Sequence, residues 1–93
     1  MHEKILNQLR EKVRDRQYIM TLHAEEEMEE DSLTIYDVER GILTGKILER
    51  QRDKVTGERK YCIIGKTTEG AEVEVIAKIS VTGKLVIITV FTP

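Results

Sequence analysis

The sequence has few of the residues that form covalent cross-links, rigid turns or membrane spans. It contains one cysteine, Cys62, and one proline, Pro93, among 93 residues. A single cysteine excludes an internal disulfide and is typical of a reducing compartment, so we expect a cytoplasmic protein. The longest apolar run, Leu85–Phe91, is too short to cross a bilayer, and no signal peptide is recognisable. No membrane partner is therefore expected.

Patterns for metals and cofactors are also missing. His2, His23 and Cys62 are too few and too scattered along the chain for a zinc site. The acidic pairs between residues 25 and 30 lack the loop pattern of a calcium site. The glycines are separate from one another and form no phosphate-binding loop. We therefore expect neither a metal nor a cofactor.

What remains is typical of one globular domain over residues 1–93, with 40% hydrophobic and 34% charged residues. The charges are unevenly distributed: residues 1–32 are net acidic, whereas residues 46–66 are net basic. A polyanion would be repelled by the first segment and attracted by the second. A solvated hairpin with ordinary surface charges would have the same composition, so both interpretations stay open.

Three helices are predicted in the first half of the chain. Leucine and valine at helical spacing predict an amphipathic helix over residues 3–16. Thr21 is a suitable N-cap for a second helix of about nine residues. The third helix has the clearest boundaries, because Thr34 can act as N-cap, Asp37 stands at the capping-box position, and Gly45 ends the helical pattern.

After Gly45 the apolar period changes from helical to alternating, which predicts strands. The four expected strands are Lys46–Arg52, Arg59–Lys66, 71–79 and Leu85–Phe91. The last strand is apolar on both faces and is therefore expected in the sheet interior. Residues 17–20 break the helical pattern and could be extended. The predicted fold is α+β, with two or three N-terminal helices followed by a four-stranded antiparallel sheet.

Several of these features together resemble one family. The segment Thr21–Met28, with its histidine at a helix start, combines with Tyr61, Gly65 and the closing run 86–90. This pattern resembles the domain of unknown function 4258, from about residue 18 to residue 91. The resemblance implies a fold related to the RelE-like ribonuclease toxins. It further implies an arginine at the position where this chain has Glu27.

The resemblance and the residue types suggest a metal-independent ribonuclease. His23 could transfer a proton, Lys60 could stabilise phosphate charge, and Tyr61 could orient a nucleotide. The expected RNA-binding residues are Arg50, Arg52, Arg59 and Lys66. Each has an ordinary structural alternative: His23 could simply fix the entry of its helix, and Tyr61 could be a half-buried sheet aromatic.

Two further residues are expected to be structural, Thr34 as the helix cap and Thr89 as a polar interruption of the face formed by Leu85, Ile87 and Phe91. His23 is a candidate partner for the Thr89 hydroxyl.

Two main functions stay open at this point. A RelE-like toxin would act on RNA or the ribosome and would have a cognate antitoxin. A non-catalytic interaction module would use its second apolar sheet face, with Ile76, Val86 and Ile88, to form a homodimer or to bind a partner protein. A small-molecule sensor is a third possibility that no specific residue supports.

Overall fold

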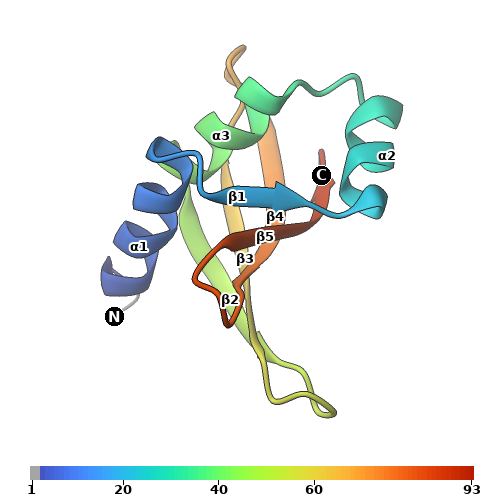
Figure 1. The fold of residues 1–93 in the computed structure, drawn as a ribbon. Helices are drawn as coiled ribbons and strands as arrows, with labels where there is room; N and C mark the ends of the chain where they lie inside the picture. Colours follow the sequence, from blue (N-terminus) through green and yellow to red (C-terminus); the bar gives the residue numbers. More distant parts are fainter. Residues whose placement is uncertain (1–2) are drawn as a thin grey trace.

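The computed structural model describes residues 3–93, and His2 lies outside this range. Within these residues the chain forms three helices and five strands (Figure 1). Their bounds are α1 Glu3–Arg14, β1 Tyr18–Met20, α2 Leu22–Glu30, α3 Ile35–Thr44, β2 Lys46–Arg52, β3 Arg59–Lys66, β4 Glu72–Ile79 and β5 Leu85–Phe91. None of the helices in residues 3–93 is long and apolar enough to span a membrane.

The sheet is mixed and five-stranded, whereas the sequence predicted four antiparallel strands. The strand order is β1-β5-β4-β3-β2. β1 runs parallel to β5, with Tyr18 opposite Leu85 and Met20 opposite Ile87, and lies beside it in Figure 1. The correction has a physical reason: an interior strand needs a neighbour on each edge, and the short β1 provides the second neighbour for β5. The predicted α+β class and the interior position of β5 are confirmed.

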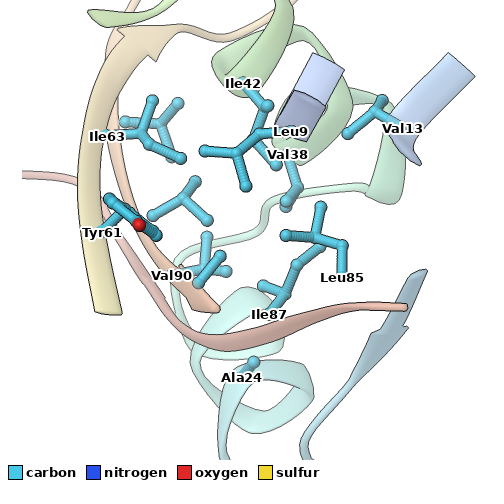
Figure 2. Close-up of a cluster of buried hydrophobic side chains, with 13 residues drawn as sticks. Leu9, Val13, Ala24, Val38, Ile42, Tyr61, Ile63, Leu85, Ile87 and Val90 are labelled. Carbon is cyan, nitrogen blue, oxygen red and sulfur yellow. The ribbon is translucent and has the colours of Figure 1, made fainter. Parts of the chain in front are cut away.

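One face of the sheet and all three helices share a single core (Figure 2). Helix residues Leu9, Ala24 and Val38 belong to the same buried cluster as Ile63 and Val75 of the sheet. Along β3 and β4, fully buried residues alternate with half-buried ones, as expected when helices cover only one face. The other side of the sheet is the open face, whose half-buried residues include Cys62, Ile64, Ile76, Val86 and Ile88.

A bulge in β5 changes which residues of that strand point into the core. Ala77 pairs with Ile87 and Ile76 pairs with Thr89, so Ile88 is an extra residue on β5. Beyond the bulge the alternation is inverted, because Val90 is buried and Thr89 is only half-buried opposite Ile76. The prediction that Thr89 interrupts the core-facing side of β5 is therefore wrong, and Thr89 lies on the open face.

The predicted helix starts are confirmed. Thr21 caps α2, where its Oγ1 accepts the backbone N–H of Ala24. Thr34 caps α3 in a complete capping box with Asp37. Leu33, the residue before the cap of α3, packs against the core that contains Val38.

Two glycines set the distance between α3 and the sheet. A Cβ added to Gly65 of β3 would overlap the carbonyl oxygen of Gly41 in α3. A Cβ added to Gly41 would lie 2.6 Å from Cγ1 of Val73 on β4. The helix can therefore rest directly on the strands only because neither position carries a side chain.

Candidate functional site

His23 lies on the solvent side of α2. Its side chain is 64% exposed, and its Nε2 is 3.2 Å from Oε1 of Glu27 one turn later. The same Glu27 oxygen accepts the backbone N–H of Val90 at 3.1 Å. The predicted partner of His23 was the Thr89 hydroxyl, but its partner in the structure is Glu27. His23 is thus linked to β5 through a carboxylate.

Side chains of α2 and of its two caps hydrogen-bond to the edge of β5 that β1 leaves free, and to the residue after β5. β1 ends at the residue opposite Ile87. The Thr21 hydroxyl then donates to the Ile88 carbonyl at 3.0 Å, and Glu27 accepts the Val90 N–H. Further on, Asp31 Oδ2 accepts the backbone N–H of Thr92 at 3.1 Å. Because arginine has no acceptor, the arginine implied for position 27 could not form the bond to Val90.

The three predicted catalytic residues lie in different parts of the molecule. Tyr61 is only 5% exposed and faces the core beneath the helices. Lys60 precedes it on β3 and therefore points to the opposite face, where its Nζ is 3.8 Å from Oδ2 of Asp53. His23 is on α2, which Figure 1 separates clearly from the loop of the β2–β3 hairpin. The structure does not bring His23, Tyr61 and Lys60 together around one substrate.

The arginines of the β2–β3 hairpin do come together. Arg52 stands directly opposite Arg59, and Arg50 stands opposite Tyr61, so all three arginines are on the helix-covered side of the sheet. They lie beyond the residues that the helices cover, and all three are exposed. With Gln51 they line a groove of about 270 Å³, here called the arginine groove. Like charges directly opposite one another destabilise a strand pair unless an anion lies between them.

Three lysines of the sheet have acidic partners within ion-pair distance, whereas in residues 3–93 the three arginines have none. Lys60, Lys66 and Lys78 each lie within 4.0 Å of a carboxylate oxygen, and Lys78 is 2.8 Å from Glu58. Within residues 3–93 no ion pair of this length involves the arginines of the groove. Their guanidinium groups are therefore available to an external anion.

Lys66, the fourth predicted RNA-binding residue, is not part of this cluster. It lies seven residues after Arg59 on β3, about 23 Å along the strand. Its side chain points to the open face, and its Nζ is 4.0 Å from Oε2 of Glu72.

A second cavity brings Tyr61 together with the arginines. It has a volume of about 350 Å³ and is here called the Tyr61 cavity. Its lining residues are Arg52, Gly57, Glu58, Arg59, Tyr61, Ile79, Ser80 and Val81. The sequence interpretation missed Gln51, Ile79 and Val81 at these two sites. Register alone would not have pointed to Gln51, because it pairs with Lys60 and alternates with Arg50 and Arg52 along the strand. Nothing local to Val81 distinguishes it from an ordinary turn residue.

Cys62 has the surroundings of an unreactive thiol. It is half-buried on the open face, with its Sγ 3.7 Å from Oε2 of Glu74. Burial first, and then the nearby Glu74 carboxylate, raise the pKa of the Cys62 thiol above its usual value. A raised pKa disfavours the nucleophilic thiolate at neutral pH. In the described part of the chain, no three His, Cys, Asp or Glu residues are grouped so that they could hold a metal ion.

Comparison with known proteins gives one match. No curated protein and no solved structure matches the chain significantly. The family model "Domain of unknown function (DUF4258)" matches residues 20–92, which includes α2, α3 and strands β2 to β5. The chain therefore belongs to the DUF4258 family.

Proposed function

We propose that this protein binds RNA along the arginine groove of its β2–β3 hairpin. The observation that carries the proposal is the direct opposition of Arg52 and Arg59, with Arg50 beside them and no acidic partner within ion-pair distance in the described residues. A phosphate between two guanidinium groups on opposed strand positions would relieve their repulsion and accept charge-assisted hydrogen bonds from both. An RNA ligand also agrees with a cytoplasmic location, which the single cysteine suggests.

The charge distribution supports an approach from the hairpin side. Residues 1–32, which include α2 with its exposed glutamates, are net acidic and would repel a polyanion. The hairpin projects away from α2 in Figure 1. RNA would therefore meet the arginines first and α2 last.

The geometry gives less support to a ribonuclease that uses His23, Tyr61 and Lys60. General acid–base catalysis needs its groups within hydrogen-bond reach of one reacting centre. These three residues lie on a helix surface, in the core and on the opposite sheet face. A RelE-like toxin with a cognate antitoxin would need a different catalytic set in this chain.

A binding experiment tests the proposal. Fluorescence anisotropy of a labelled oligouridine, measured over a range of salt concentrations, should give an affinity that falls as salt rises. Replacement of either Arg52 or Arg59 by glutamine should weaken binding and lower the salt slope by about 1, for the phosphate that is no longer neutralised. Lys66→Gln is the matched control, because it removes one positive charge from the far end of β3. An equal weakening of binding in the control, or no salt-dependent binding by the wild type, would refute the proposal.

A second function, self-association, is favoured by a separate observation. All three helices lie on one face of the sheet, which leaves Ile76, Val86 and Ile88 half-buried on the open face. Acidic and basic side chains are interleaved around them, as with Glu74 and Lys78, so two copies of this face would not repel each other through net charge. We propose a homodimer that buries the two open faces against each other, rather than a complex with an unrelated protein.

A further inference from the structure

The Tyr61 cavity lies directly beside the arginine groove. The two sites share Arg52 and Arg59, which therefore separate them. The other lining residues come from β3, from the end of β4 and from the loops at the end of each hairpin, and no helix residue lines the cavity. The cavity is thus a continuation of the helix-covered sheet face, past the point where the helices end.

The strand alternation gives this cavity an apolar floor. Tyr61 and Ile79 both point to the helix-covered side, because Ile79 follows the buried Ala77 by two residues. Val81 continues from Ile79 into the β4–β5 turn, and its side chain is fully exposed. An aromatic ring and two aliphatic side chains therefore line the cavity together with two arginines.

The one acidic lining residue is already neutralised. Glu58 forms an ion pair with Lys78, with 2.8 Å between Oε2 and Nζ. The hydrogen bond from Lys78 lowers the pKa of the Glu58 carboxyl below its usual value. Because Lys78 is bound to it, the Glu58 carboxylate presents little uncompensated negative charge to an anion in the cavity.

We infer that the Tyr61 cavity receives one unpaired base of the RNA, while Arg52 and Arg59 bind the phosphates that flank it. This inference rests on the proposed RNA binding and adds the form of RNA that is recognised. Single-stranded bases can turn outward and contact aromatic rings, arginine planes and apolar side chains, whereas the bases of a duplex are stacked inside. The volume of about 350 Å³ is at the lower end of ligand pockets, which suits a single nucleotide. The protein should therefore prefer single-stranded over duplex RNA.

A matched pair of valines tests the inference. Val81 lines the cavity, whereas Val55 is at the tip of the β2–β3 loop outside both sites, and each is almost fully exposed. Either valine can therefore become serine without a change in the core. Val81→Ser should weaken oligouridine binding several-fold and leave inorganic polyphosphate binding unchanged, whereas Val55→Ser should change neither. In the wild type, oligouridine should bind more tightly than its duplex with oligoadenosine.

The possible outcomes separate this inference from the proposed function. If the wild type binds oligouridine, duplex and polyphosphate equally well, the arginine groove binds anions and the base site is refuted. Equal effects of Val81→Ser and Val55→Ser would also refute the base site. If none of the three ligands binds with salt dependence, the proposed RNA binding itself fails. A direct check is methyl NMR with uridine monophosphate, which should shift the Val81 and Ile79 methyl signals more than inorganic phosphate does.

Discussion

The Glu27 carboxylate accepts the backbone N–H of Val90 at 3.1 Å, and so closes the edge of β5 where no strand pairs with it. Glu27 is mostly shielded from solvent, with a side-chain exposure of 21%. An unpaired N–H at a sheet edge can pair with the backbone of another chain, and many proteins prevent this by covering the edge with a helix or loop. Here a helix covers the edge with a side-chain acceptor instead of a backbone one.

We predict that Glu27→Ala lowers the free energy of unfolding by about 1–2 kcal/mol, because it removes a charge-assisted hydrogen bond to a partly buried N–H. Glu27→Gln should lose less, since its side-chain carbonyl can still accept. Urea denaturation measures both variants. Glu26→Ala, which changes an exposed neighbour, is the control and should stay within about 0.5 kcal/mol of the wild type. Equal losses at positions 26 and 27 would contradict the role of the Val90 bond.

Asp37 should make the stability of the fold depend on pH in the acidic range. Hydrogen bonds from the Thr34 backbone N–H, and then from the Thr68 hydroxyl and N–H, lower the pKa of Asp37 from 3.8 to about 2. Because the folded-state pKa is lower than the unfolded one, the stabilisation is complete above pH 4 and is lost as the pH falls towards 2.

The Asp37 contribution amounts to about 2 kcal/mol at neutral pH. Asp37→Asn should therefore unfold at lower urea concentration at pH 7, and its difference from the wild type should shrink between pH 4 and pH 2. Unfolding curves collected across this pH range provide the measurement. A constant difference at every pH would mean that the Asp37 charge is not what joins α3 to the β3–β4 turn.

Gly65→Ala should be strongly destabilising, because its new Cβ would collide with the carbonyl of Gly41 and push α3 away from the sheet. Overpacking of this kind typically costs about 1–3 kcal/mol, and backbone is harder to displace than a side chain. Thermal unfolding followed by circular dichroism should show a lower Tm. Thr68 hydrogen-bonds to Asp37 of α3. The losses of unfolding free energy in Thr68→Ala and Gly65→Ala should therefore add in the double variant only if α3 keeps its position, and a smaller total loss would show that the helix has moved.

The proposed homodimer gives a separate prediction. Wild-type protein should sediment as a dimer, and Ile76→Glu should sediment as a folded monomer, because a buried unpaired charge opposes face-to-face packing. Val55→Glu places the same change on an exposed loop and should leave the dimer intact. A wild type that stays monomeric at every concentration would end this proposal while the RNA-binding proposal stands.

The predictions made from sequence were accurate where the cause is local. A cap needs only the few residues around it, so Thr21 and Thr34 marked the starts of α2 and α3 correctly. The parallel pairing of β1 with β5 was missed because three residues carry almost no pattern and the pairing spans most of the chain. The face of Thr89 was predicted wrongly because a bulge depends on the pairing of two strands and cannot be recognised from the sequence of one strand.

The candidate site divides in the same way. The net charge of residues 46–66 indicated the basic hairpin, and charge can be read directly from the sequence. The register of β2 and β3 decides which of these cations cluster. It places Arg50, Arg52 and Arg59 on one face of the sheet and Lys60 and Lys66 on the other. The predicted grouping of His23 with Tyr61 required the relative positions of a helix and a strand, which local patterns do not determine.

His23→Ala is the variant that separates binding from catalysis. His23 is exposed, and within residues 3–93 its one side-chain partner is Glu27, so its loss should change the free energy of unfolding by less than about 0.5 kcal/mol. We predict unchanged oligouridine affinity, because His23 lies on α2 and not on the hairpin. Cleavage assays with purified RNA and with translating ribosomes, together with growth after induced expression, complete the test. If the wild type cuts RNA and His23→Ala lowers the rate by about 10²–10⁴, as loss of a general acid or base does, then His23 acts in catalysis and the hairpin alone does not account for the function.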